Sequence, residues 1–174
     1  MSKLIKKVAL IGFMGAGKST VGRLVARRLG FRLVDTDRLI ERRLRLSIPA
    51  IFARQGEKRF RRLEDQLVAR LIYQSRLVVA TGGGIPVHSP TWPRLAEESL
   101  TVFLDPPFEW LWQHISHDPH RPLATGRSRE ELRRLWQSRR EVYREADLIL
   151  DPSLITPRQA ATIIVRVFYE DRAL

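Results

Sequence analysis

The fold of this chain is decided by residues 12–20, which read Gly12-Phe13-Met14-Gly15-Ala16-Gly17-Lys18-Ser19-Thr20. This stretch fits the pattern G-x-x-x-x-G-K-[ST] without a gap. Glycines let the backbone curl so that several N–H groups point at one chain of phosphates, an approach that side chains would block. The Lys18 side chain is expected to reach the β- and γ-phosphates, and the Ser19 hydroxyl to bind Mg²⁺. The pattern therefore predicts a phosphate-binding loop.

The segments on either side of this loop have the order that such a loop requires. Residues 8–11 before it form an apolar run that is typical of a buried strand. After it, apolar residues recur on one face of a helix, at Val21, Leu24, Val25 and Leu29. Gly30 is placed to end this helix, whose N-terminus would point at the bound anion. A glycine-rich turn that matches by chance is therefore the weaker interpretation.

Length and composition narrow the class of protein. The chain has 174 residues, which favours one domain with a substantial core, and its 44% hydrophobic content indicates a globular protein. It has no cysteine, which excludes disulfides, thiolate metal sites and thiol catalysis. The basic N-terminus is not followed by an apolar signal region, and no apolar run approaches membrane-spanning length. We therefore expect a cytoplasmic protein with no membrane partner.

The net charge of +12, mostly from arginine, has two interpretations. One is nucleic-acid binding through phosphate contacts. The other is a solvated arginine-rich surface together with a site for anionic small molecules. The arginines are spread over several predicted helices and lack the interleaved aromatic residues of a base-stacking surface. The second interpretation is favoured, and no nucleic-acid partner is expected.

Strand and helix signals alternate through the rest of the chain. Apolar runs predict further buried strands at residues 31–34, 77–80, 101–104 and 147–150. This alternation predicts an α/β fold with a parallel sheet covered on both faces. A terminal helix is expected to begin at Thr156-Pro157. Its buried positions are predicted to be Ile163, Ile164, Val167 and Phe168.

Two polar stretches follow predicted strands, where parallel sheets place their ligands. Asp35-Thr36-Asp37 offers two carboxylates for Mg²⁺ or for a substrate that carries hydroxyl groups. The alternative is that one of these carboxylates only caps the next helix. Thr81-Gly82-Gly83-Gly84 indicates close approach of the backbone to a ligand or to a packed helix, and its position favours a ligand.

The segment at residues 117–127 is long, polar and rich in proline and histidine, which is typical of a functional loop such as a lid. His117 and His120 are interpreted as solvated rather than as zinc ligands, because no closed ligand set accompanies them. Ser128 and Glu131 form a capping box that opens the next helix. Trp110 is assigned to the core rather than to a cofactor platform.

These motifs together resemble the shikimate kinase family, which is related to nucleoside monophosphate kinases. Besides the phosphate-binding loop, the resemblance rests on five blocks in family order, namely Asp35-Thr36-Asp37, residues 56–64 (GEKRFRRLE), Thr81-Gly82-Gly83-Gly84, Arg121-Pro122-Leu123, and Arg139 with Tyr143. It implies a P-loop NTPase fold of the nucleoside monophosphate kinase type. It also implies a five-stranded parallel sheet flanked by helices, in a single domain over residues 1–174 with a mobile lid at about residues 116–128. The implied activity is ATP-dependent phosphorylation of the 3-hydroxyl of shikimate, in chorismate and aromatic amino-acid biosynthesis.

The resemblance also implies roles for particular residues. The catalytic residues would be Lys18, Asp37 and Arg121. ATP would be bound by Gly12, Gly15, Ala16, Gly17, Lys18, Ser19, Thr20, Arg121 and Pro157. Shikimate would be bound by Asp37, Arg61, Gly82, Gly83, Gly84 and Arg139. The Mg²⁺ ion would be bound by Ser19 and Asp35.

Physical chemistry fits these implied roles. Arginine forks such as those of Arg61 and Arg139 suit the ring carboxylate. Glu64 lies one helical turn from Arg61 and is expected to orient its guanidinium, although an ordinary surface pair is the alternative. Asp37 would hold substrate hydroxyls. Whether it also acts as a base stays open, because phosphoryl transfer through a loose transition state needs little base help.

Three positions depart from the family pattern. His114 stands where arginine often stacks on adenine, Ala124 where leucine often follows Arg-Pro-Leu, and Glu141 where proline is usual. These departures concern nucleotide affinity and lid motion rather than phosphate or substrate contacts. A gluconate-type kinase of the same fold is the nearest alternative, and a nucleic-acid-binding P-loop protein is the rival from another class. The expected partners are shikimate and ATP, and the expected state is a monomer.

Overall fold

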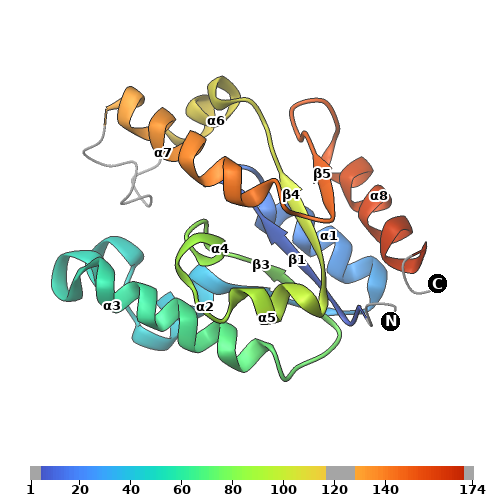
Figure 1. Ribbon diagram of the computed structural model, residues 1–174, viewed down its shortest axis with the longest axis horizontal. Coiled ribbons are helices and arrows are strands. Elements are labelled where there is room, and N and C mark those ends of the chain that lie inside the picture. The colour runs from blue at the N-terminus through green and yellow to red at the C-terminus, as the bar shows by residue number, and fades with distance from the viewer. Residues whose placement is uncertain (1–4, 117–127, 171–174) are drawn as a thin grey trace.

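The computed structural model describes residues 5–116 and 128–170 of the chain. Five parallel strands form one sheet in the order β2-β3-β1-β4-β5 (Figure 1). The strands are β1 (Lys7–Ile11), β2 (Arg32–Asp35), β3 (Leu77–Ala80), β4 (Ser99–Leu104) and β5 (Leu148–Leu150). The predicted five-stranded parallel sheet is therefore confirmed, and each strand ends within about one residue of its predicted position.

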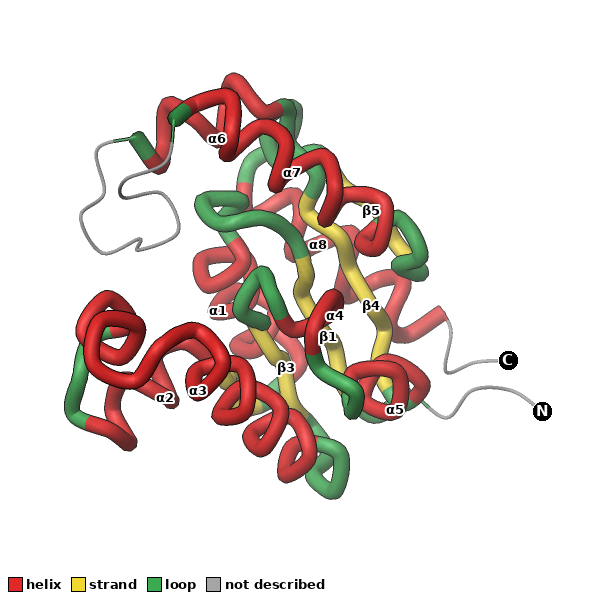
Figure 2. Tube along the Cα trace, turned by 60° about the vertical axis from the view of Figure 1, so that its left-hand side comes forward, coloured by secondary structure: helices red, strands yellow, loops and turns green. Residues whose placement is uncertain are grey.

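Helices cover both faces of this sheet (Figures 1 and 2). They are α1 (Lys18–Leu29), α2 (Thr36–Leu44), α3 (Ile48–Leu71), α4 (Ile85–His88), α5 (Trp92–Glu97), α6 (Phe108–Ile115), α7 (Arg129–Tyr143) and α8 (Pro157–Glu170). Val78 of β3 packs with α1 and α8 in the largest core cluster. Its neighbour Val79 packs with α3 and α5 on the opposite face. The central strands β1, β3 and β4 are buried along their whole length, as is typical of a parallel sheet covered on both faces.

Several helices begin and end at the signals that the sequence carries. Gly30 ends α1 in the left-handed conformation with a φ of 64°, as predicted. Ser128 and Glu131 form both hydrogen bonds of the capping box that opens α7. In α8, Ile164 and Phe168 are buried as predicted, but the prediction for Ile163 is wrong, since this side chain is 36% exposed.

The helix α3 changes direction at Gly56, whose φ of 76° and ψ of 164° are not helical. The part after Gly56 carries the GEKRFRRLE block and packs Phe60 and Leu63 into a core cluster with Ile40 of α2. This break sets the angle at which α3 presents its charged face to the carboxyl ends of the strands.

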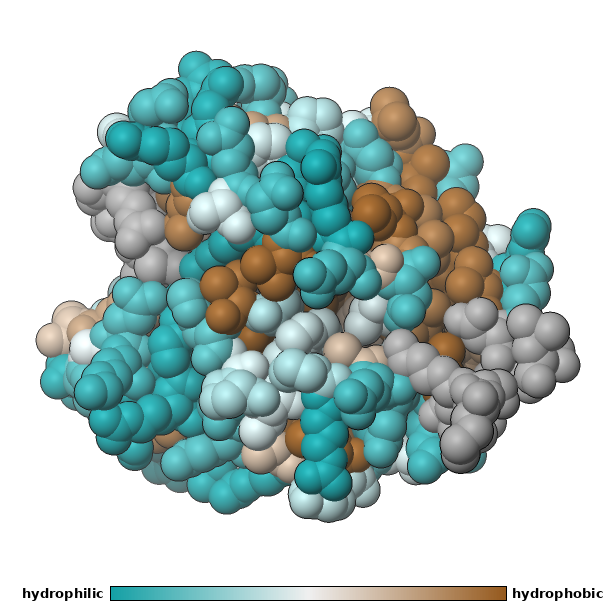
Figure 3. Space-filling model, in the orientation of Figure 1, coloured by the Kyte–Doolittle hydropathy of each residue, from teal (hydrophilic) through white to brown (hydrophobic). Residues whose placement is uncertain are grey.

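The surface seen in Figure 3 is mostly hydrophilic, with its largest apolar area over β5 and the segment that leads to α8. Ile149 and Leu154 are exposed there. No helix among residues 5–116 and 128–170 is long and apolar enough to cross a lipid bilayer.

Candidate active site

The loop after β1 has the backbone that its glycines predict. Gly12, Gly15 and Gly17 have φ angles of 141°, 82° and 88°, which residues with a side chain rarely adopt. A Cβ atom at Gly12 would also lie 2.6 Å from the carbonyl oxygen of Leu104 at the end of β4. The loop therefore needs glycine at this position both for its conformation and for its contact with the sheet.

The first residues of α1 bring two functional side chains to the carboxyl end of the sheet. Lys18 Nζ donates to the loop carbonyls of Gly12 and Phe13, at 2.7 and 2.9 Å. Ser19 Oγ donates to Asp35 Oδ2 at 2.5 Å, which joins α1 to the end of β2. Both oxygens are hard ligands of the kind that Mg²⁺ prefers, so the pair that the sequence predicts for the metal fits such an ion.

The two carboxylates of the Asp35-Thr36-Asp37 stretch have different surroundings. Asp35 caps α2, because its Oδ1 accepts from the backbone N–H of Arg38 at 3.2 Å. Capping and the contact with Ser19 thus occur together. Asp37 lies in the first turn of α2, and its Oδ1 is buried without a hydrogen-bond partner among the described residues. This oxygen is available to a bound hydroxyl group.

Burial raises the pKa of Asp37 to about 6, and the negative charge of Asp35 adds to this rise. Lys18 and Arg61 lower the pKa, but by less than the burial raises it. A carboxylate with a pKa close to neutral both accepts a hydrogen bond from a hydroxyl and can take its proton.

Arg61 is held between two carboxylates of its own helix. Its Nη1 donates to Glu64 Oε2 at 2.6 Å, and its Nη2 donates to Glu57 Oε1 at 2.7 Å. Glu64 is only 2% exposed, whereas Glu57 is about half exposed. The predicted pairing of Arg61 with Glu64 is confirmed, and it is not an ordinary surface pair. The contact with Glu57 was missed, although its i, i+4 spacing is visible in the sequence.

Glu64 is a second carboxylate with unusual acidity. Burial raises its pKa to about 7, while Arg61 lowers it in part. Its Oε1 is buried with no hydrogen-bond partner among the described residues, as is Oδ1 of Asp37. Both unpaired oxygens lie beside Gly82, where an added Cβ atom would be 2.5 Å from each. Glycine at position 82 leaves the space that these two carboxylates share.

The other two glycines after β3 also face charged side chains. A Cβ atom at Gly84 would overlap Nη1 of Arg61. At Gly83 it would lie 3.2 Å from Nη1 of Arg139. The sequence left open whether these glycines approach a ligand or a packed helix. In the structure these glycines approach charged side chains that line a pocket. Gly82, Gly83 and Gly84 also line this pocket themselves.

Arg139 comes from α7 and is 4% exposed. Its Nε is buried without a hydrogen-bond partner among the described residues, and its guanidinium lies 5.8 Å from the ring centre of Phe13. Burial lowers the pKa of Arg139. One turn further along, the Tyr143 hydroxyl donates to the Gly83 carbonyl, and burial raises the pKa of Tyr143 to about 12. Tyr143 therefore stays protonated and keeps the glycine segment against α7.

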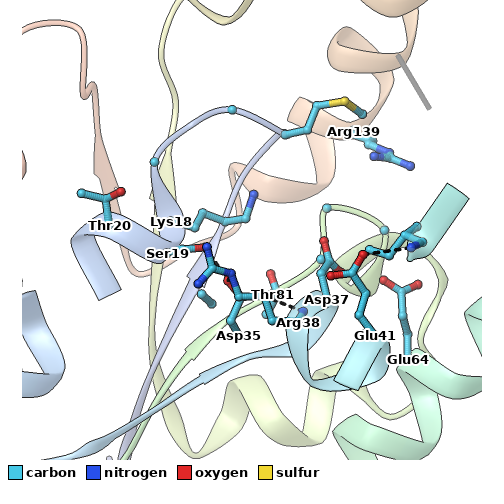
Figure 4. A pocket seen from close by; sticks show the side chains of 18 of the residues that line it. Lys18, Ser19, Thr20, Asp35, Asp37, Arg38, Glu41, Glu64, Thr81 and Arg139 are labelled. Carbon is cyan, nitrogen blue, oxygen red and sulfur yellow. Dashed lines mark hydrogen bonds and ion pairs between the residues drawn. The ribbon is translucent and has the colours of Figure 1, made fainter. Parts of the chain in front are cut away.

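These side chains line one cavity of about 680 Å³, which lies within the usual range for ligand sites. Figure 4 shows Lys18 and Arg139 on one side of it, with Asp35, Asp37, Glu41 and Glu64 on the other. The structure brings together the following predicted site residues along its walls: Gly15, Gly17, Lys18, Ser19, Thr20, Asp35, Asp37, Arg61, Gly82, Gly83, Gly84, Arg139 and Pro157. Gly12 and Ala16, which belong to the same loop, do not line it, and Ala16 is fully buried.

The sequence is similar to one family of known proteins over most of its length. The family model described as Shikimate kinase matches residues 14–168. The shikimate kinase of Persephonella marina is 37% identical over 161 residues, which cover 92% of this chain and 98% of that protein. The chain belongs to the shikimate kinase family. The shikimate kinase of Synechococcus elongatus is 44% identical over 140 residues, or 80% of this chain and 73% of that protein.

Solved structures of shikimate kinases share the fold. The shikimate kinase from Acinetobacter baumannii in complex with shikimate has a TM-score of 0.90 and 34% identity, covering 97% of this chain and 96% of that chain. The Aquifex aeolicus enzyme has a TM-score of 0.82 and 31% identity, covering 96% and 98%. A sugar kinase from Janibacter, with 18% identity and a TM-score of 0.57 over 93% of each chain, shares only the fold. The predicted P-loop kinase fold is confirmed, and the gluconate-type alternative is not favoured.

In this member of the shikimate kinase family an aromatic pair lines the cavity near the phosphate-binding loop. The rings of Trp110 and His114 stack with centroids 3.8 Å apart, and His114 Nδ1 lies 2.6 Å from the Trp110 carbonyl oxygen. Trp110 packs against the core as predicted, but it also lines the cavity, a role that was missed. Its i, i+4 spacing from His114 is the signal that could have indicated a shared face.

Some residues that the shikimate kinase resemblance singles out lie outside the described residues. These are Arg121, Ala124, His117 and His120, with nearly all of the expected lid. Glu141 lies within the described part of α7 and does not line the cavity. Among residues 5–116 and 128–170, no group of three or more histidine, cysteine, aspartate or glutamate side chains is arranged to hold a metal ion. A metal bound here would thus depend on other oxygens, such as those of phosphates.

Proposed function

We propose that this protein transfers the γ-phosphoryl group of ATP to the 3-hydroxyl of shikimate, in the biosynthesis of chorismate and the aromatic amino acids. The observation that carries this proposal is one cavity that joins a phosphate-binding loop to a cluster of two arginines and a carboxylate. Arg61 and Arg139 line the cavity from α3 and α7, and Asp37 lines it from α2. Figure 4 shows Arg139 across the cavity from Asp37. A small acid with hydroxyl groups matches both kinds of contact.

The acceptor end of the cavity suits shikimate. Two arginine forks can hold one ring carboxylate through charge-assisted hydrogen bonds. The unpaired Oδ1 of Asp37 can accept a hydrogen bond from a ring hydroxyl. The backbone of Gly82, Gly83 and Gly84 forms a wall without side chains, against which a flat ring can lie. The related Acinetobacter baumannii structure holds shikimate, which supports this acceptor.

The donor end suits ATP. The glycine-rich loop and the N-terminus of α1 would bind the phosphates, and Lys18 would leave the loop carbonyls to neutralise charge on the transferred group. Ser19 and Asp35 would hold Mg²⁺, and the ion would neutralise negative charge on the phosphates. Pro157 and His114 line the cavity beyond the loop, where the adenine would lie. Arg121 would complete the charge at the phosphates from the lid, which would also exclude water.

Asp37 would orient the attacking hydroxyl toward the γ-phosphate. Its pKa of about 6 makes it a carboxylate at neutral pH, able to take the hydroxyl proton as the new P–O bond forms. We further propose that residues 1–174 act as one kinase domain and that the protein works as a monomer, because described residues of a single chain supply both ends of the cavity. We also propose that it acts in the cytoplasm.

An ADP-release assay with ATP and Mg²⁺ tests the proposal, with shikimate, gluconate and no acceptor compared side by side. We expect strong stimulation by shikimate alone. Equal stimulation by gluconate would favour a broader sugar-acid kinase. ADP release without any acceptor preference would contradict the proposal, and salt-dependent retention on nucleic acid would then support the rival class.

A further inference from the structure

A second cavity, of about 440 Å³, opens between α2, α3 and β2. It shares no lining residue with the candidate active site. β2 ends the sheet on this side, so the cavity lies at the edge of the molecule where α2 runs beside α3 (Figure 2). Its floor is aliphatic and includes the buried side chains of Val34, Ile40, Leu63 and Leu71. Its volume lies within the range of small-molecule sites.

Arginines form the rim of this groove. Arg32, Arg42, Arg43 and Arg70 all line it and are exposed, and no carboxylate is among its described lining residues. Arg32 donates to Gln74, whereas the side chains of the other three have no hydrogen bond or ion pair within the described part of the chain. The rim is therefore an uncompensated positive field next to an apolar floor.

Several other arginines of this protein, unlike those of the rim, form ion pairs with carboxylates. Arg129 and Arg133 share Glu109 between α6 and α7, and Arg140 pairs with Asp105 through two nitrogens. An arginine-rich surface alone would not distinguish the groove from the rest of the protein. The groove is distinguished by unpaired arginines on its rim together with a buried aliphatic floor. A ligand can contact both the rim and the floor only if it carries an anionic head on an apolar body.

We propose that this groove binds a small carboxylate with an apolar tail. The tail would lie on the aliphatic floor, where each buried methylene is favourable. The head would be held by the forks of Arg43 and Arg70, which face the groove from α2 and α3. The occupant is a single small molecule rather than a membrane, since the binding surface is a cavity between two helices and not an exposed apolar face.

Ligand binding here would also act on the active site, a step that rests on the proposed function. Ile40 lies one turn from Asp37 on α2, and Leu63 is next to Glu64 on α3. The same two helices thus form the floor of the groove and one wall of the substrate cavity. A ligand between them changes the position of Asp37 relative to Arg61. Because coupling is reciprocal, shikimate and the carboxylate must change each other's affinity by the same factor.

The binding test uses the unmodified protein and isothermal titration calorimetry with decanoate. Decyltrimethylammonium, which has a similar tail and the opposite charge, is the control for the charge of the head. Octanoate, which has a shorter tail, tests how much the length of the tail contributes to binding. We expect decanoate to bind, octanoate to bind about ten-fold more weakly through its two fewer methylenes, and the cation not to bind. Equal affinity for decanoate and decyltrimethylammonium, or no binding of decanoate, would overturn the proposal. Binding only to decanoate-containing vesicles would overturn it as well.

Variants locate the site. Arg43→Ser/Arg70→Ser removes two rim charges, and Arg23→Ser/Arg27→Ser removes two exposed charges from α1 as a control. We expect decanoate binding to weaken about ten-fold in the first variant and to be unchanged in the second. Thermal unfolding verifies that both are folded. Equal decanoate affinity in the two variants would show that the groove is not the site.

Kinetics test the coupling. With the unmodified protein and with Arg23→Ser/Arg27→Ser, decanoate should change the KM for shikimate and leave the KM for ATP unchanged. Arg43→Ser/Arg70→Ser should keep its basal activity and lose this response. An unchanged KM for shikimate at saturating decanoate would overturn the coupling while the binding result stands. Absence of basal kinase activity in the unmodified protein would instead contradict the proposed function.

Discussion

Arg61 and Glu64 form a buried ion pair one turn apart on α3, with Nη1 and Oε2 separated by 2.6 Å. Glu64 is 2% exposed, and its other oxygen is unpaired among the described residues. A buried carboxylate of this kind is unfavourable unless a partner compensates its charge. Its evident partner is the guanidinium of Arg61, which lines the candidate substrate cavity. Glu64 is therefore a positioning residue for substrate binding.

Glu64→Gln keeps the shape of this side chain and removes its charge. Because the hydrogen bond from Arg61 would lose its ionic character, we expect the guanidinium to be held less firmly, the KM for shikimate to rise about ten-fold, and kcat to change far less. Glu57→Gln is the matched control, since Glu57 bonds the same guanidinium from an exposed position. Its KM should change by less than about three-fold. Steady-state kinetics with both variants would contradict the assignment if the two effects were equal.

Arg139→Ala tests the arginine from α7. Arg139 is 4% exposed, and its Nε has no partner among the described residues, so a bound carboxylate is the partner that the site provides for it. We expect the KM for shikimate to rise by at least about thirty-fold, as is usual when one partner of a buried charge pair is removed. Arg134→Ala removes an exposed arginine from the same helix and should leave the KM unchanged. A normal KM in Arg139→Ala would contradict carboxylate binding by this residue.

Gly84→Ala tests the reason for glycine beside Arg61. The new methyl group would overlap the end of the Arg61 side chain, which is flexible and can move away. The protein should therefore fold normally while its arginine fork is displaced, so the KM for shikimate should rise about ten-fold. Thermal unfolding and kinetics measured together separate this outcome from misfolding. If both are unchanged, the close approach at Gly84 has no role in binding.

Much of this site was predictable because its signals are local. The loop at residues 12–20, the carboxylates after β2 and the Arg61–Glu64 pair all depend on spacing within a few residues. Asp35 shows the limit of such reasoning, because a role in binding metal or substrate and a role in capping appeared as alternatives. In the structure Asp35 caps α2 and also contacts Ser19, the other predicted metal ligand.

Contacts between distant segments were not predictable in the same way. The Tyr143 hydroxyl donates to the Gly83 carbonyl, which is 60 residues away in the sequence, and no periodic sequence pattern predicts this contact. The groove between α2 and α3 likewise depends on how two helices pack at the edge of the sheet. The exposure of Ile163 was mispredicted because helical periodicity defines an apolar face without stating how wide a stripe the neighbouring elements cover.

Asp37 links activity to stability. Its pKa rises from 3.8 to about 6 on folding, mainly through burial, so between these values the folded state binds more protons than the unfolded state. Because the folded state binds more protons in this window, the free energy of unfolding falls as the pH rises through it. The free energy of unfolding then stays lower above pH 6. The charged Asp37 thus destabilises the protein at neutral pH, by about 3 kcal/mol.

Asp37→Asn should therefore be more stable than the unmodified protein at pH 8, by about 3 kcal/mol, and close to it at pH 4. Urea unfolding at both pH values measures the difference. Glu97→Gln, an exposed carboxylate on α5, is the control and should change stability by less than about 0.5 kcal/mol at either pH. The same Asp37→Asn variant should lose most of its turnover, because the amide cannot accept the hydroxyl proton. A variant that is stabilised at pH 8 yet fully active would separate the burial of Asp37 from its proposed role.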